Sequence, residues 1–109
     1  MKYYQVIILP SAERDIGGAY EWLAEQEAEA AIRWYNRLLE VIFSLDTFPE
    51  RCPLAPESEF FNSEIREIFH GRRQHKYRIL FTVSESKVHV LHVRHGARLA
   101  LGETESSEG

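Results

Sequence analysis

The cationic side chains of this sequence are concentrated in residues 64–98. This stretch carries eight Lys and Arg residues against three Glu residues, a net charge of +5, whereas the whole chain carries −4. Because association follows the local field and not the summed charge, the stretch can present a basic surface to a polyanion. Charges of this kind also keep a hydrophobic sheet soluble, which is the simpler interpretation. The predicted basic surface comprises Arg66, Arg72, Arg73, Lys76, Arg78, Arg94 and Arg98.

Among these cations, Arg78 lies in the most apolar sequence context. It lies within KYRILFTV at residues 76–83, a segment that is otherwise mostly apolar and β-prone. A guanidinium in such a strand must bind an anion or open into a cleft, because an unpaired buried charge is strongly unfavourable. Glu67, on the preceding predicted strand, is the expected internal partner. The sequence therefore predicts Arg78 either in an internal ion pair or at the wall of a half-open basic concavity.

All five histidines lie in the same basic stretch. His89, His92 and His95 recur at every third residue, and a regular strand would place His92 on the opposite face from the other two. Three imidazoles so arranged cannot converge on a metal ion, so we predict no metal site and no cofactor. The single cysteine, Cys52, excludes an internal disulfide, and its thiol is expected to be inert.

Length and composition predict one soluble domain. The chain has 109 residues, of which 44% are hydrophobic, so it can form a core. No apolar run approaches the roughly 18 residues of a membrane span, and the N-terminal run is too short for a signal peptide. With one cysteine, these features predict a cytoplasmic protein with no membrane partner. Residues 1–98 form the predicted domain, and the acidic residues 99–109 a flexible tail.

Periodicity predicts a strand and two helices in the first half of the chain. Tyr3–Leu9 is a β-prone apolar run, and Ser11 is the expected N-cap of the helix that follows. Gly17 and Gly18 lie inside this helix, where each costs about 1 kcal/mol relative to alanine. We therefore expect either tight packing or a bend at these glycines. A turn at residues 25–29 leads to a strongly amphipathic second helix, antiparallel to the first.

Three strands are predicted in the second half. Residues 48–61 are rich in proline and are expected to form an ordered surface loop pinned by Phe48, Leu54 and Phe60. The expected strands are Glu64–Phe69, Lys76–Val83 and Lys87–His95, the last two joined as a hairpin. The order β-α-α-β-β-β predicts an α+β fold, with an antiparallel helical hairpin packed on one face of a small, mostly antiparallel sheet.

Four local patterns cover nearly the whole chain: LPSAERDI at 9–16, LDTFPERCPLAPE at 45–57, KYRILFTV at 76–83 and VHVLHVRHGAR at 88–98. In their order and spacing they resemble the RelE/ParE superfamily of toxins from type II toxin–antitoxin modules, and most closely its ParE-like, plasmid stabilisation branch. The resemblance implies a RelE/ParE-like fold. It also implies a toxin that a cognate antitoxin neutralises in a hetero-oligomer, by wrapping the sheet and helices of the toxin.

One chemistry in this superfamily is nucleolytic. RelE-like members resemble ribosome-dependent endoribonucleases that cut messenger RNA, and this resemblance assigns candidate catalytic roles to Arg78, Arg94, His95 and Arg98. The arginines would stabilise the phosphate and His95 would transfer a proton. The chain departs from the pattern of catalytic members after the last strand, where they typically carry a tyrosine or a similar acid/base group. It has Gly96, Ala97 and the apolar residues 99–101 there.

The other chemistry is inhibition by binding. ParE-like members resemble inhibitors of DNA gyrase that need no catalytic acid, so the departures above do not weaken this interpretation, which we prefer. Two alternatives stay open: a ribosome-dependent endoribonuclease, and a non-toxic remnant that only binds an antitoxin. Whether the chain is an enzyme depends on which of them holds.

Overall fold

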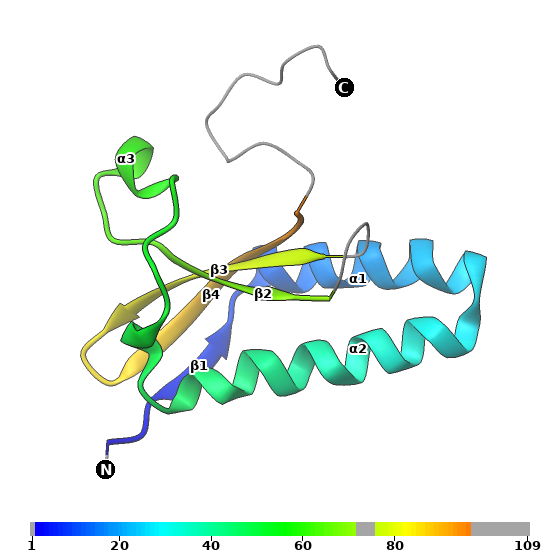
Figure 1. Cartoon of the computed structure of the whole chain (residues 1–109), viewed down its shortest axis with the longest axis horizontal. Helices are drawn as coiled ribbons and strands as arrows, with labels where there is room; N and C mark the ends of the chain where they lie inside the picture. The colour runs from blue at the N-terminus through cyan, green and yellow to red at the C-terminus, as the bar shows by residue number, and fades with distance from the viewer. Residues whose placement is uncertain (1, 72–75, 97–109) are drawn as a thin grey trace.

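The computed structural model describes residues 2–71 and 76–96 (Figure 1). Its elements are β1 (Gln5–Ile8), α1 (Pro10–Gln26), α2 (Ala28–Phe43), the 3₁₀ turns η1 (Ser44–Asp46) and η2 (Pro49–Arg51), α3 (Ser58–Phe61), β2 (Arg66–His70), β3 (Tyr77–Ser84) and β4 (Lys87–His95). The predicted order of strands and long helices is confirmed, and α3 is an addition within the predicted loop. Arg72, Arg73, Arg98 and the predicted tail 99–109 lie outside the described residues.

The strands of the described ranges form a four-stranded mixed sheet in the order β1-β4-β3-β2. β1 pairs parallel with β4, whereas the β4–β3 and β3–β2 pairs are antiparallel. The β3–β4 hairpin turns at Glu85 and Ser86. Glu85 has a left-handed φ of 57°, as a two-residue hairpin turn requires. The structure therefore confirms the predicted α+β fold with a mostly antiparallel sheet.

The helices α1 and α2 run antiparallel and cover one face of this sheet (Figure 1). α1 ends at Gln26 and α2 begins at Ala28, so their connection is the single extended residue Glu27, shorter than the predicted turn. Apolar side chains from both helices and from the sheet bury one another here, and that burial is the main stabilising term. The core comprises Ala12, Ile16, Leu38, Ile42, Leu45, Cys52, Tyr77, Ile79, Phe81, Val88, Val90 and Val93. No helix in residues 2–71 and 76–96 is both long and apolar enough to cross a membrane.

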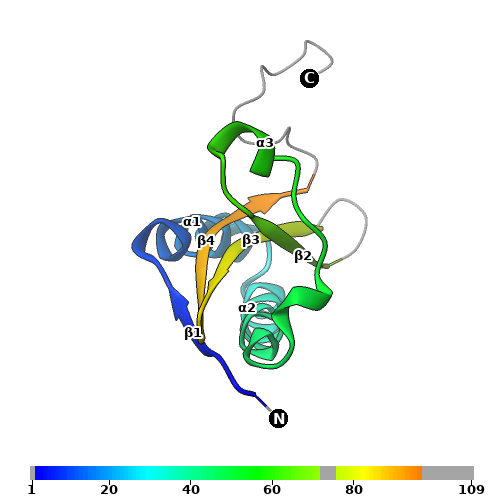
Figure 2. The same cartoon turned by 90° about the vertical axis from the view of Figure 1, so that its left-hand side faces the viewer.

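Residues 52–65, here called the strap, pass along the edge of β2 and then cover the other face of the sheet. The strap contains α3, which lies on the opposite side of the sheet from α2 (Figure 2). Its residues Ala55 and Ile65 pack with Leu80 of β3 in a second, smaller core. The backbone N–H of Ala55 donates to the carbonyl of Ile65 at 2.6 Å, and the Ser58 hydroxyl both donates to that carbonyl and accepts from the Ile65 N–H at 2.9 Å. The strap is thus an ordered layer.

The expectation that aromatic and leucine side chains pin residues 48–61 is wrong. Phe48, Leu54 and Phe60 are 65%, 49% and 51% exposed. Smaller or charged residues are buried in their place, namely Pro49, Cys52, Ala55 and Glu57. Between strap and sheet, the buried positions are taken by Ala55, Ile65, Leu80 and an ion pair described below.

Ser11 does not cap α1, contrary to the sequence-based expectation. The helix begins at Pro10, with Leu9 as the N-cap residue and no capping side chain, and proline suits a first helical position because its φ is already helical. The Ser11 hydroxyl instead donates to the carbonyl of Leu91 at 2.7 Å. One turn later, Asp15 accepts from the N–H of Val93 at 3.0 Å. These side chains satisfy the edge of β4 beyond the end of β1.

A β-bulge at Leu91 changes which histidines share a face. Phe81 pairs with Val90 and Leu80 with His92, which leaves Leu91 without a partner in β3. His89 and His92 therefore both lie on the face opposite the helices, and His95 lies on the helix side. The predicted separation of His92 from His89 and His95 is wrong, because strict alternation does not continue through a bulge. Among the described residues, no group of three His, Cys, Asp or Glu side chains could hold a metal ion.

Candidate functional site

Arg78 lies in a buried ion-pair network between β3, β2 and the strap. Its Nη1 and Nη2 atoms donate to the two carboxylate oxygens of Glu57 at 3.0 and 2.8 Å. Its Nε and Nη2 atoms donate to Oε1 of Glu67 at 3.0 and 2.9 Å. Arg78 is 6% exposed and Glu57 is fully buried. This bidentate pairing fixes the residue that precedes α3, and with it the strap, to the centre of the sheet.

The two carboxylates keep Arg78 charged. Burial alone would lower the pKa of Arg78, but the hydrogen bonds and negative charges of Glu57 and Glu67 outweigh it and raise the pKa above its ordinary value. The predicted pairing with Glu67 is confirmed. Glu57 was missed because it lies in a proline-rich segment with no periodic pattern. The signal that could have revealed a second acceptor is the donor count, since a guanidinium has five N–H groups and one carboxylate cannot satisfy them all.

Arg94 and His95 lie on opposite faces of the sheet. Arg94 stands opposite Arg78 in the β3–β4 pair, and His95 stands opposite Tyr77. The His95 ring packs edge-on against Tyr77 on the helix side, with 5.2 Å between centroids. On the strap side, Nε of Arg94 is buried and has no hydrogen-bond partner in the described part of the chain. Of the residues proposed for nuclease chemistry, the structure thus brings Arg78 and Arg94 together but places His95 across the sheet from them.

The other described members of the predicted basic surface have local roles. Arg66 donates to the carbonyl of Cys52 at 2.6 Å and lies 3.7 Å from a carboxylate oxygen of Glu64. The Lys76 ammonium lies 4.4 Å from the centroid of the Phe69 ring, a cation–π contact. The predicted basic surface is therefore divided in the described part of the chain. Arg66 contacts the strap, Arg78 lies in the buried network, and Lys76 lies at an exposed end of β3.

Two further titratable groups are shifted by burial. Burial raises the pKa of the Cys52 thiol, although the nearby charges of Arg51 and Arg66 act in the opposite direction. The thiol thus stays protonated near neutral pH, which disfavours nucleophilic chemistry there. Burial also lowers the pKa of His70; a hydrogen bond with the Trp34 backbone opposes this shift and the charge of Arg37 adds to it. His70 is therefore a neutral side chain at the end of β2, facing α2.

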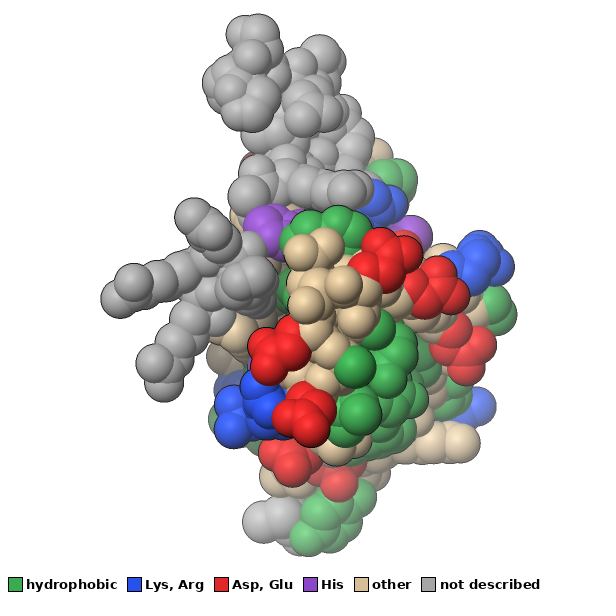
Figure 3. Space-filling model, turned by 90° about the vertical axis from the view of Figure 1, so that its right-hand side faces the viewer, with side chains coloured by type: hydrophobic (Ala, Val, Ile, Leu, Met, Phe, Trp, Pro, Cys, Tyr) green, Lys and Arg blue, Asp and Glu red, His purple; other side chains and the backbone are tan. Residues whose placement is uncertain are grey.

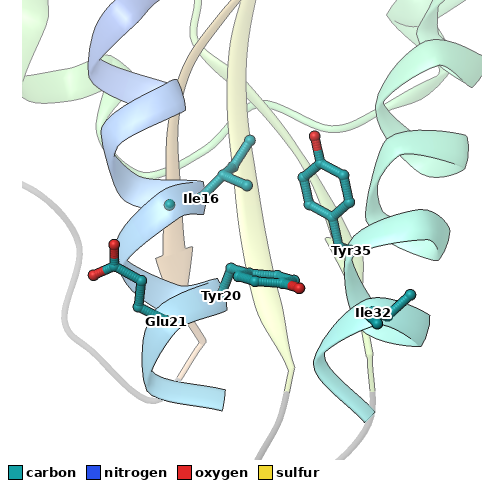
Figure 4. A pocket seen from close by; sticks show the side chains of 6 residues that line it. Ile16, Tyr20, Glu21, Ile32 and Tyr35 are labelled. Atoms are coloured by element: carbon teal, nitrogen blue, oxygen red, sulfur yellow. The ribbon is translucent and has the colours of Figure 1, made fainter. Parts of the chain in front are cut away.

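A groove between α1 and α2 lies near the turn that joins them (Figure 4). Its walls are Ile16, Gly17, Tyr20 and Glu21 of α1 and Ile32 and Tyr35 of α2. The Tyr20 and Tyr35 rings meet edge to face across it, with 5.8 Å between centroids. Ile32 is 48% exposed and Tyr35 37% exposed. Their place on the apolar stripe of α2 suggested core positions, but the helical hairpin extends past the end of the sheet, which leaves this part of the stripe uncovered (Figure 1).

Acidic side chains border this groove. The view onto the α1–α2 turn shows a hydrophobic patch with carboxylates around it (Figure 3). The exposed acids of this end of the hairpin are Glu21, Glu25, Glu27 and Glu29. Arg33, beside Ile32, is exposed as well, so the surroundings of the groove carry both signs of charge. An exposed apolar groove suits a segment of another chain that carries apolar side chains.

Comparison with known proteins agrees with this architecture. The family model described as "ParE toxin of type II toxin-antitoxin system, parDE" matches residues 6–100. A solved chain described as "Chromosomal ParDE TA system from P. aeruginosa" superposes with a TM-score of 0.69. That match is 15% identical in sequence and covers 85% of this chain and 96% of the other, so it supports the fold. No curated protein sequence is similar enough to count as a match. Because the family model spans most of its length, this chain belongs to the ParE toxin family of type II toxin–antitoxin systems.

Proposed function

We propose that this toxin acts by binding its target and not by cleaving nucleic acid, and that the target is DNA gyrase. The observation that supports binding is the state of Arg78. A nuclease would need this guanidinium free to stabilise the charge that develops on a phosphate. Here its donors already bind the carboxylates of Glu57 and Glu67.

A phosphate could reach Arg78 only by displacing the strap. Such a displacement would leave the carboxylate of Glu57, which is fully buried, without its counterion. Breaking a buried ion pair in this way costs roughly 3–5 kcal/mol. The position of His95 across the sheet adds a second obstacle, because an acid/base group must lie within hydrogen-bond reach of the reacting atoms.

The choice of gyrase rests on the resemblance to ParE-like toxins. A gyrase target also places the protein in the bacterial cytoplasm, where it would inhibit growth as part of a plasmid stabilisation module. The partner that keeps the toxin silent is its cognate antitoxin, bound in a hetero-oligomer. The groove between α1 and α2 supports such a partner, because an exposed apolar surface favours docking of a protein segment.

Purified components test this function. Adding the toxin to DNA gyrase and relaxed plasmid should inhibit supercoiling, and an equimolar amount of antitoxin should restore it. His95→Gln and Arg94→Gln should still inhibit, since a binding toxin needs neither proton transfer nor a phosphate clamp. Cleavage of messenger RNA on translating ribosomes that either substitution abolishes would overturn the proposal in favour of the nuclease. If the chain neither inhibits gyrase nor cleaves RNA but binds the antitoxin, it is a non-toxic remnant.

A further inference from the structure

Residues 58–64, here called the lobe, form a turn of the strap that the fold anchors at its base. Glu57, directly before the lobe, is fully buried and binds Arg78 through both carboxylate oxygens, at 2.8 and 3.0 Å. The Ser58 hydroxyl closes the base of the lobe, because it donates to the carbonyl of Ile65 and accepts from the Ile65 N–H, each at 2.9 Å. The lobe is therefore tied to the sheet at both of its ends.

The side chains of the lobe contribute little to the folded core. All residues in the range 59–64 are exposed, and α3 has no buried residue. Phe60 is 51% exposed and Phe61 is 53% exposed. Neither ring belongs to either of the two cores of the described residues. Burial within this fold therefore does not account for two adjacent phenylalanines, whose exposure to water is unfavourable.

Two exposed phenylalanines on an anchored turn have the properties of a binding surface. Aromatic side chains are enriched at the centres of protein interfaces, where each ring buries a large apolar area. A backbone that is already ordered lowers the entropic cost of association. The lobe lies on the opposite side of the sheet from α2 (Figure 2). Its surface is thus separate from the groove between α1 and α2.

The charges of the lobe indicate the chemistry of its partner. The lobe contains no Lys or Arg, and it carries Glu59 before the phenylalanine pair and Glu64 after it. Glu64 lies 3.7 Å from Arg66, whereas Glu59 makes no ion pair in the described part of the chain. Lys and Arg bind carboxylates, and the faces of aromatic rings attract the same cations. The complementary surface is therefore an apolar pocket with basic side chains beside it.

We propose that the lobe binds the target enzyme, with Phe60 and Phe61 in an apolar pocket of gyrase and Glu59 paired with a Lys or Arg beside that pocket. This inference rests on the proposed function, because it takes gyrase as the partner. An enzyme that handles DNA carries Lys and Arg on its surface to bind phosphates, so it can supply the basic side chains. The target then binds on the opposite side of the sheet from the helical hairpin.

Purified gyrase tests the aromatic part of the surface. Phe60→Ala and Phe61→Ala should each raise the toxin concentration that half-inhibits supercoiling by about tenfold, because each removes an aromatic anchor. The thermal midpoints of both variants should stay close to that of the natural chain, since neither ring lies in a core. Phe43→Ala is the matched control. Phe43 is 48% exposed at the end of α2, and this variant should inhibit like the natural chain.

Charge variants test the electrostatic part. Glu59→Lys should weaken binding to gyrase and reduce the loss of affinity with added salt, because it replaces an attractive contact by a repulsive one. Glu40→Lys makes the same charge change at an exposed position of α2 and should have little effect.

Several results would overturn this inference while leaving the function intact. Equal inhibition by the natural chain, Phe60→Ala and Phe61→Ala would do so, and so would an equal loss in Phe43→Ala. The lobe would be an antitoxin surface if the two variants lost affinity for the antitoxin but still inhibited gyrase. It would be a contact between toxin copies if sedimentation showed a natural dimer that the two variants dissociate. If the natural chain does not inhibit gyrase at all, the proposed function itself fails.

Discussion

Glu57 is a buried charged residue whose carboxylate is compensated by a single arginine. Its side chain is fully buried, and both of its oxygens accept from Arg78. An isolated carboxylate would be strongly unfavourable in this position, so the residue is tolerated only because the guanidinium compensates it. The ion pair therefore stabilises the strap only while both charged side chains are present.

Replacing Glu57 should destabilise the toxin strongly. Glu57→Gln keeps the shape but removes the charge opposite Arg78, and should lower the free energy of unfolding by about 3 kcal/mol. Glu64→Gln is the matched control, because the Glu64 side chain is 78% exposed and lies 3.7 Å from Arg66. The control should change the free energy of unfolding by no more than about 0.5 kcal/mol. Urea unfolding measures both, and an equal loss in the two variants would contradict this account of Arg78.

His70 should make the stability depend on pH. The pKa of His70 is lowered below 6.5 in the folded protein, first by burial. Between that lowered pKa and 6.5, the unfolded chain binds a proton that the folded chain does not. The free energy of unfolding should therefore rise with pH through this window and fall on acidification below neutral pH. His70→Phe should flatten this part of the curve of urea midpoint against pH. An unchanged slope would show that His70 is not the group responsible.

At the scale of elements, α1 also serves as a cover for the edge of β4. Asp15 accepts from the N–H of Val93, and Nδ1 of His92 lies 2.9 Å from the same carboxylate oxygen. Ser11 binds the carbonyl of Leu91 one helical turn earlier. An exposed strand edge invites pairing with other chains, and these two side chains block it without a further strand.

Hydrogen exchange tests this cover directly. Asp15→Ala removes the acceptor of the Val93 N–H, so the exchange rate of that amide should rise by about tenfold. Ser11→Ala removes a donor to the Leu91 carbonyl and should leave the Val93 amide protected, which makes it a control for general loosening of α1. If Val93 exchanges equally in both variants, the helix is held to β4 by packing alone.

The helices and strands could be predicted from the sequence more accurately than the contacts between them. Alternation along residues 76–83 and the apolar stripe of the second helix identified the sheet and the hairpin, because both arise from periodic burial. The bulge at Leu91 follows from pairing between strands, which no pattern within one strand records. Ser11 was predicted to cap the helix because of its position before it. A hydroxyl can also donate to a carbonyl of another element, and in the folded protein Ser11 donates to the carbonyl of Leu91. The groove was not predicted because it forms where the helices extend past the end of the sheet. The spacing of apolar residues does not show how far a helix extends past a sheet.

At the scale of the whole molecule, the fold pairs charges that are far apart in the sequence. Glu57 comes from the acidic first part of the chain and Arg78 from the basic stretch, yet they form the most buried ion pair described here. Asp15 and His92, which are also far apart in the sequence, lie with a carboxylate oxygen 2.9 Å from Nδ1 of the imidazole. Arg78 is therefore paired inside the fold and is not part of an exposed basic surface. Exposed acidic side chains, in contrast, lie beside the groove between α1 and α2.

The central claim is that this member of the ParE toxin family poisons a DNA-handling enzyme by binding it. The most direct measurement is inducible expression of the chain alone in bacteria, following the incorporation of labelled thymidine and labelled methionine over the first minutes. Our account predicts that DNA synthesis fails first, with filamentation and a DNA-damage response, and that co-expressed antitoxin prevents both. Failure of protein synthesis before DNA synthesis would contradict the account and assign the toxin to ribosome-dependent cleavage of messenger RNA.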